Sequence, residues 1–189
     1  MSEKREIEDI KENYVGIKRT YVMPLLVLTT ICLVVSGALA LMDSVTYPII
    51  SAAAVERAQA SMAEIIPDAT GFEEVDFEVF EGIPSTIREV YRTTNDVGYI
   101  FIAAINGFSG DITVISGITS DGRIIACDTL SHTETKGIGT ILELETFLGP
   151  FRGLDSQLDG IDTVTGATIS TRAYIRAIED IFEAFEIIK

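Results

Sequence analysis

The feature that most constrains this chain is residues 21–42, YVMPLLVLTTICLVVSGALALM, which contain no charged side chain. About 20 apolar residues in a helix cross the roughly 30 Å hydrocarbon core of a bilayer. Pro24 lies near the start of the run, where a helix tolerates a missing N–H. The run therefore predicts one transmembrane helix.

Basic residues flank the N-terminal end of this run. Lys18 and Arg19 precede it, and no basic residue follows it before Arg57. Because cytoplasmic segments carry an excess of Lys and Arg, we expect residues 1–20 in the cytoplasm and residues 43–189 outside it. The prediction is a single-pass protein of the plasma membrane.

A cleaved signal peptide is the alternative reading of the same run. Residues 38–40 read Ala-Leu-Ala, which resembles a cleavage site. The apolar run is longer than the 7–15 residues usual in a signal peptide, and the charged leader is also long. These lengths favour a retained anchor, and cleavage stays an open alternative.

The segment after the run is strongly acidic. Residues 43–189 hold nine basic and 24 acidic side chains and carry the whole formal charge of −15. This composition argues against nucleic acid as a partner, because phosphate backbones call for basic patches. Two cysteines, Cys32 and Cys127, and one histidine, His132, give no spacing typical of a metal site. No catalytic residue and no metal ligand are predicted.

The pattern after the span predicts an α+β fold. Residues 43–71 are expected to form a linker with a first helix at 44–66, and residues 72–189 a domain with a mostly antiparallel sheet packed by helices. A short helix and a longer amphipathic helix follow the strand-like runs. The strand-like runs lie at residues 75–80, 86–92, 98–105, 112–118 and 123–130, and the helices at 142–148 and 171–188.

A loop of small and hydroxyl residues, DTVTGATIS at 162–170, precedes the last predicted helix. Backbone N–H groups and the helix dipole make such a helix start suitable for a phosphate. Gly166 and Ala167 leave the backbone accessible, and the Thr168 hydroxyl can hydrogen-bond to a phosphate or be esterified by one. Ser170 or Thr171 is a plausible N-cap, so an ordinary helix-capping loop is an equally good reading of the residues.

Two further loops complete the pattern: GFSG at residues 107–110 and HTETKGIG at 132–139. The TGATIS sequence at 165–170 resembles the [ST]-G-A-T-x-[ST] attachment motif of covalent FMN-binding domains. The second loop resembles the H-x-E-T-P-G-x-G loop of the same family. With the N-terminal span, the chain resembles the G subunits of Rnf electron-transport complexes. These are related to the C subunits of Na⁺-translocating NADH:quinone reductases.

This resemblance implies FMN bound through a phosphoester to Thr168. It also implies that a flavin transferase using FAD makes the bond, and that the FMN serves electron transfer in a membrane-bound, ion-translocating oxidoreductase. The chain would be a redox subunit of this translocase, not catalytic alone, with membrane lipid and the other membrane and iron–sulfur subunits as partners. The other residues implied to contact the cofactor are Thr165, Gly166, Ala167, His132, Glu134, Thr135 and Ile138.

The chain departs from the family pattern at Lys136, where the family usually has proline. The loop thereby loses a fixed φ angle and gains a cation. Two alternatives stay open beside the Rnf-type reading. One is a flavinylated subunit of another extracytoplasmic electron-transfer chain, and the other is an anchored assembly or binding domain without flavin.

Overall fold

A computed structural model describes residues 21–137 and 139–189 of the chain. It divides into two units, one that ends at Ala53 and one formed by Ala54–Lys189, and each is described by itself. The predicted cytoplasmic segment, residues 1–20, and the predicted site residue Ile138 lie outside the described residues.

One long helix replaces the two helices expected at the N-terminal end. Helix α2 (Met23–Ile65) runs without a break through the predicted span and the predicted linker helix, with Pro48 in its interior. Both predicted segments are therefore helical, and the helix continues from one into the other. The hydroxyl side chains at this place do not cap a new helix. Ser44 Oγ donates to Leu41 O at 2.8 Å, inside the same helix.

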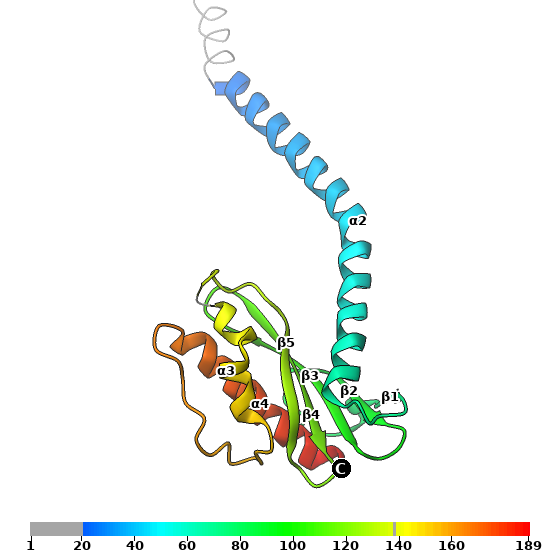
Figure 1. Cartoon of the computed structure of the whole chain (residues 1–189). Helices are drawn as coiled ribbons and strands as arrows, with labels where there is room; N and C mark the ends of the chain where they lie inside the picture. Colours follow the sequence, from blue (N-terminus) through cyan, green and yellow to red (C-terminus); the bar gives the residue numbers. More distant parts are fainter. Residues whose placement is uncertain (1–20, 138) are drawn as a thin grey trace, which may run out of the picture. The chain divides into compact units, whose positions relative to one another are not determined.

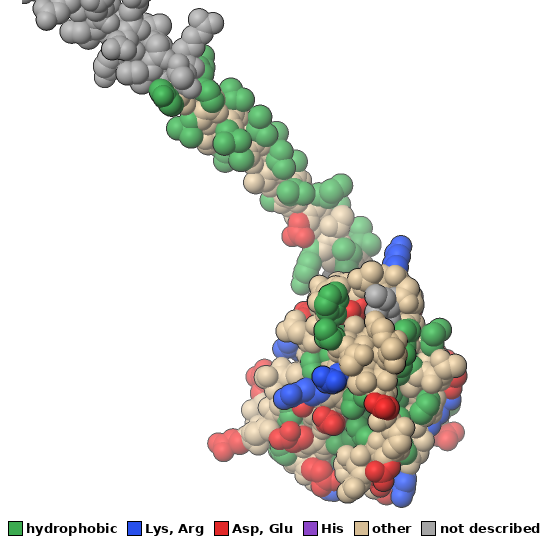
Figure 2. Space-filling model, turned by 90° about the vertical axis from the view of Figure 1, so that its left-hand side faces the viewer, with side chains coloured by type: hydrophobic (Ala, Val, Ile, Leu, Met, Phe, Trp, Pro, Cys, Tyr) green, Lys and Arg blue, Asp and Glu red, His purple; other side chains and the backbone are tan. Residues whose placement is uncertain are grey.

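The first unit has the character of a membrane-spanning segment. An 18-residue window of α2 reaches a mean hydropathy of 2.5, and none of it is buried in the protein. Apolar side chains cover the visible side of the helix in Figure 2. Within residues 21–137 and 139–189, α2 is the one helix that is long and apolar enough to cross a membrane. The last turns of α2, from Ala54 on, belong to the second unit.

The second unit is built on a five-stranded antiparallel sheet, in which each strand pairs with the next one along the chain (Figure 1). This confirms the predicted α+β fold with an antiparallel sheet. Alternating apolar residues and short turns between the strands favour this simple order. The strands are β1 (Phe72–Glu74), β2 (Ile87–Thr93), β3 (Gly98–Asn106), β4 (Asp111–Thr119) and β5 (Ile124–His132).

The first strand is not where the alternating pattern put it. Residues 75–80 were expected to form a strand, but pairing with β2 ends at Glu74, and residues Phe77–Val79 form the 3-10 helix η2. The side chain of Phe77 still packs against the core, whereas Val79 is exposed. The alternation of apolar and polar residues at 75–80 therefore arises from a 3-10 helix with one side chain packed on the core, and not from a strand.

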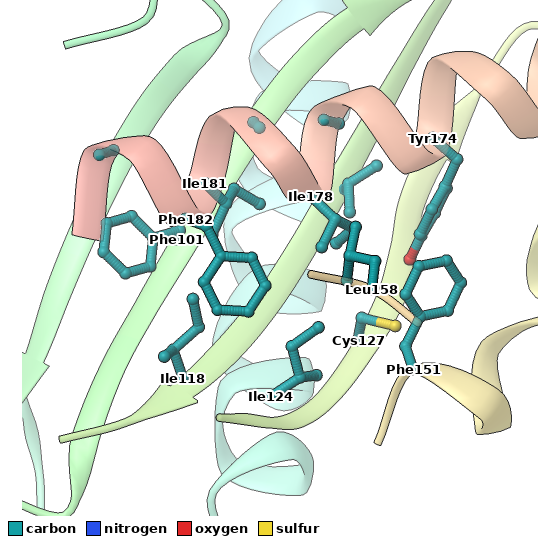
Figure 3. Packing of buried hydrophobic residues seen from close by; sticks show 14 of the residues in the cluster. Phe101, Ile118, Ile124, Cys127, Phe151, Leu158, Tyr174, Ile178, Ile181 and Phe182 are labelled. Carbon is teal, nitrogen blue, oxygen red and sulfur yellow. The ribbon is translucent and has the colours of Figure 1, made fainter. Parts of the chain in front are cut away.

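Helix α4 (Thr168–Ile188) covers one face of the sheet and contributes seven of the 21 buried residues described in the larger core. In Figure 3 its labelled side chains, among them Tyr174, Ile178 and Phe182, point toward those of the sheet. Tyr174 is fully buried, and its ring lies edge-on to that of Phe147, with centroids 5.3 Å apart. The apolar stripe predicted for this helix is thus core packing.

A short helical segment connects β5 to the last loop. It consists of η3 (Gly139–Glu143), α3 (Glu145–Leu148) and η4 (Gly149–Phe151). The sequence predicts a single helix here that ends at Gly149-Pro150. The helical path instead continues through them, because Pro150 falls in the first turn of η4, where its missing N–H has no cost.

The end of α2 covers the other face of the sheet. Met62 and Ile65, with the adjacent Ile66, form a second buried cluster with Ile100 and Ile115 of the strands. Gly117 of β4 permits this close approach, because a Cβ at Gly117 would overlap the Ile65 side chain. The sheet is therefore packed from both sides, by α4 and by the last turns of α2.

A substitution of Gly117 by valine tests this packing. We expect the full-length protein in detergent to lose about 1–3 kcal/mol of unfolding free energy, because overpacking a core costs this much. The loss should be measured by denaturant unfolding. Adding Ile65→Ala should recover part of it, since the two side chains compete for one space. If the double variant loses the sum of what the Gly117→Val and Ile65→Ala variants lose alone, the proposed contact between the two positions is contradicted.

Candidate functional site

Three segments that are distant in the sequence meet at one end of the sheet. They are the 107–110 turn between β3 and β4, the loop after β5, and the first turn of α4. Glu134 in the second segment contacts both of the others through hydrogen bonds. The structure thus brings together the three loops that the sequence analysis singled out.

The Glu134 side chain is buried, with 6% of its surface exposed. Its Oε1 accepts hydrogen bonds from the backbone N–H of Phe108 at 2.7 Å and of Ser109 at 3.0 Å. Its Oε2 accepts one from Ser170 Oγ on α4 at 2.7 Å. Both carboxylate oxygens are therefore engaged by the protein itself.

These hydrogen bonds keep the buried Glu134 carboxyl charged. Burial alone would raise the pKa of Glu134, since it disfavours the ionised form. The hydrogen bonds from Ser170, Ser109 and Phe108 outweigh burial and lower the pKa below its usual value of 4.5. At neutral pH the carboxylate is a fixed negative charge that holds three segments in place.

Glycines make room for this arrangement. A Cβ at Gly107 would overlap Glu134 Oε1, and one at Gly110 would overlap Thr133 Oγ1. A Cβ at Gly139 would overlap the Cβ of Glu134. The two glycines of the GFSG turn thus allow this turn to pack closely against the Glu134 loop, which a plain hairpin turn would not require.

Helix α4 begins at Thr168, three residues earlier than the sequence suggested. Its N-cap is Ala167, which provides no side-chain hydrogen bond to the first turn. The predicted cap residues have other partners: Ser170 binds Glu134, and Thr171 Oγ1 accepts from the backbone N–H of Val164 at 3.2 Å. The prediction that either one caps the helix was wrong. The first N–H groups of α4 have no side-chain cap and can bind an anion.

A pocket of about 290 Å³ opens at this helix start and is lined by Phe108 and by residues 166–170. Gly166 has a φ of +90°, and nothing lies within 4 Å of where its Cβ would be. The Thr168 side chain is partly exposed, and its Oγ1 lies 3.5 Å from Val164 O. The pocket thus presents the partly exposed Thr168 hydroxyl, an open glycine and a helix N-terminus.

Phe108 is a site residue that the sequence analysis missed. Its side chain is 68% exposed, which is unusual for a phenylalanine, and it lies beside Thr168 in the pocket. The signal in the sequence was an aromatic residue within a G-x-x-G turn. Such a residue can be assigned to the site only when the turn is known to lie beside the start of α4.

The predicted residues Thr165, Thr135 and His132 do not line this pocket. Thr165 and Thr135 are exposed, and Thr135 Oγ1 lies 3.3 Å from Ser109 Oγ. The Nδ1 of His132 accepts from the backbone N–H of Glu134 at 3.2 Å, which leaves the proton of a neutral imidazole on Nε2. That Nε2 lies 3.4 Å from a carboxylate oxygen of Glu143. His132 is thus oriented by the protein on both sides. In the part of the chain that the structure describes, no three His, Cys, Asp or Glu side chains group as metal ligands.

A comparison with known proteins finds a family match that includes the same three segments. The FMN-binding domain family matches residues 107–183, which include the GFSG turn, the Glu134 loop and Thr168. The G subunit of an ion-translocating oxidoreductase complex from Methanosarcina acetivorans is 30% identical over 135 residues, which cover 65% of this chain and 72% of the relative. The chain belongs to the family of G subunits of ion-translocating oxidoreductase complexes.

Other G subunits match over most of their length. The one from Shewanella piezotolerans is 29% identical over 178 residues, covering 82% of this chain and 84% of the relative. The G subunit of a proton-translocating ferredoxin:NAD(+) oxidoreductase complex from Clostridium ljungdahlii is 24% identical and covers 82% and 86%. The resemblance to FMN-binding domains and to Rnf-type G subunits is thereby confirmed at the level of the family.

Replacing Glu134 by glutamine tests its role in this G subunit. At pH 7 we expect a loss of about 1.5–3 kcal/mol of unfolding free energy, the usual worth of hydrogen bonds to a charged group. A folded pKa below 4.5 stabilises the fold above pH 4.5, and this contribution disappears as the pH falls through the folded pKa. The stability difference between wild type and variant, measured by denaturant unfolding from pH 7 to 3, should therefore shrink in acid.

Ser170→Ala is the matched control, because it removes one of the hydrogen bonds to Glu134 and leaves the charge. It should cost about 1.5–3 kcal/mol at pH 7, because the lost hydrogen bond is to a charged group. A Glu134→Gln variant as stable as wild type at pH 7 would show that the carboxylate does not join the three segments.

Proposed function

We propose that this chain carries FMN covalently on Thr168 and passes electrons within a membrane-bound, ion-translocating oxidoreductase complex of the Rnf type. The observation that carries the proposal is the position of Thr168. Its hydroxyl lies at an uncapped helix start, in a pocket that an exposed aromatic side chain also lines. A phosphate ester there would place the negative charge at the positive end of the α4 dipole.

In the proposed arrangement, the phosphate, the ribityl chain and the flavin ring of FMN would each contact a different part of the pocket. The first N–H groups of α4 would bind the phosphate, and Thr165, Gly166 and Ala167 would line the path of the ribityl chain. The open space at Gly166 supports this, because no side chain fills it. Phe108 would stack on the flavin ring, since an exposed aromatic face suits a flat π system. FMN, when bound, supplies reversible electron transfer, and the protein supplies position and charge.

The Glu134 loop would form the second wall of this site. Both oxygens of Glu134 have protein donors, so its role is to position the Phe108 turn and the start of α4. His132, Thr135 and Ile138 are proposed to contact the flavin or to shape the wall beside it. Lys136 is exposed in the same loop and brings a cation where the family usually has proline.

Attachment of FMN to Thr168 requires a second protein. The one described contact of Thr168 Oγ1 is with Val164 O, a carbonyl that cannot serve as a base at neutral pH. A flavin transferase would activate the hydroxyl, whose oxygen bonds to the riboflavin-bearing phosphorus of FAD. The bond between the two phosphates breaks, AMP leaves, and the hydroxyl proton passes to the transferase or to water.

The names of the relatives support a role within a larger assembly. Their names describe G subunits of ion-translocating complexes, one of them a ferredoxin:NAD(+) oxidoreductase. We propose that α2 anchors the chain in the plasma membrane as a single span, with residues 1–20 cytoplasmic and the domain outside. Its partners would be the membrane and iron–sulfur subunits and the surrounding lipid. The chain would act as a redox subunit of this translocase and not as an enzyme alone.

Thr168→Ala tests the attachment directly. The protein should be made with its flavin transferase, and a denaturing gel viewed under ultraviolet light. Wild type is expected to give a fluorescent band, and Thr168→Ala none, because the ester oxygen is gone. The control is Thr163→Ala, whose hydroxyl lies outside the pocket lining. A wild type without a fluorescent band would refute the covalent flavin.

Phe108→Ala tests the stacking role. The fluorescent band on the denaturing gel should remain, since Thr168 is untouched. In the folded protein, however, acrylamide should quench the flavin fluorescence more strongly, because one side of the ring loses its cover. Leu144→Ala, at another exposed apolar residue, is the control. Unchanged quenching in Phe108→Ala would remove Phe108 from the site.

A further inference from the structure

A second hollow lies directly beside the Thr168 pocket. It is a groove of about 740 Å³, and the exposed side chain of Ile169 lines both. Its walls are formed by β2 and the segment before it, the end of β3, and α4 from Ile169 to Glu183. Three of its lining residues are arginines, Arg88, Arg172 and Arg176.

These arginines differ from the other arginines of the second unit. Arg92, Arg123 and Arg152 form ion pairs with Asp96, Asp121 and Glu145, and Arg57 donates to Thr129 O. Within residues 54–137 and 139–189, the side chains of the three groove arginines form no ion pair and no hydrogen bond. Their guanidinium donors are therefore available to a partner.

Local structure directs these side chains to the same groove. Arg172 and Arg176 are four residues apart on α4, so they lie on one side of the helix. Arg88 lies at a β-bulge, where the pairing of β2 with β3 shifts between Ile87 and Glu89. The bulge lets the consecutive residues Ile87 and Arg88 both face α4, one in the core and one in the groove.

The positive charge of the groove is an exception, because residues 43–189 carry a formal charge of −15. The groove also contains Asp180 and Glu183, and Asp180 accepts a hydrogen bond from Thr86 Oγ1 at 2.8 Å. A domain of net negative charge repels acidic partners, so three unpaired arginines in one groove favour that groove as the place where such a partner binds. We propose that this arginine groove docks an acidic segment of another subunit of the complex.

Two observations favour a protein carboxylate as the occupant. Guanidinium groups form paired hydrogen bonds with carboxylates, and Arg is enriched in protein interfaces. The apolar residues Ile105, Ile169 and Ala173 line the groove together with its arginines, a mixture typical of such interfaces. Ile169, the residue after Thr168, lines the groove. A docked subunit would therefore lie beside a flavin attached to Thr168. This inference rests on the proposed function, which supplies the complex and the flavin.

Cross-linking in native membranes tests the proposal. Arg88→Lys and Arg176→Lys keep the charge and introduce amines, which a carbodiimide joins to carboxylates in direct contact, with loss of water. We expect peptide mapping to find amide bonds from these two positions to Asp or Glu of another subunit. Arg92→Lys, on the same strand as Arg88 but outside the groove, should give no such bond.

Charge removal provides the second measurement. Arg88→Gln with Arg176→Gln should weaken retention of the other subunits by the tagged chain about tenfold, in solubilised membranes at low ionic strength. The control is Arg92→Gln with Lys189→Gln, an equal change in charge on β2 and at the end of α4, both in ion pairs. This control should retain the partners as wild type does.

The outcomes separate the inference from the proposed function. A fluorescent flavin band in all variants, together with unchanged retention in the groove variant, would overturn the inference alone. Cross-links confined to Asp180 and Glu183 of the same chain would also overturn it. Binding of the groove variant to phosphatidylglycerol vesicles is measured in parallel, and a loss of vesicle binding with unchanged subunit retention would assign the groove to lipid and overturn the inference. Absence of the flavin band from wild type would instead contradict the proposed function.

Discussion

The buried carboxylate of Glu134 is the interaction on which the geometry of the site depends. Burying a charge is costly unless it is hydrogen-bonded, and here backbone N–H groups of the Phe108 turn and the hydroxyl of Ser170 supply those bonds. Each donor comes from a segment that would otherwise be an independent loop or helix end. Satisfying one charge therefore fixes the aromatic side chain and the helix start relative to each other.

Helix α4 joins stability to function. Its apolar side packs on the sheet, with Tyr174 and Ile178 fully buried, so its first turn is held by the core. That turn presents Thr168 in the pocket, and the next turns present Arg172 and Arg176 to the neighbouring groove. One rigid element would thus carry the cofactor bond and part of the partner surface, which suits an electron-transfer site that must not move.

Much of the fold could be predicted from the sequence, because the signals were local. Alternating apolar residues and turn residues indicated the strands β2 to β5, and the apolar stripe indicated α4. The errors arose where side chains have distant partners. Ser170 and Thr171 look like helix caps, yet one binds Glu134 and the other the loop at Val164. The exposure of Phe108 beside Thr168 depends on the pairing of β3 with β4 and could not be read from its neighbours in the chain.

The most direct test of the account is the mass of the intact protein, made with its flavin transferase, with peptide mapping around Thr168. The account predicts a mass equal to the chain plus one FMN minus one water, with the addition on the peptide that contains Thr168. A mass equal to the bare chain, or a flavin mapped to another residue, would contradict it.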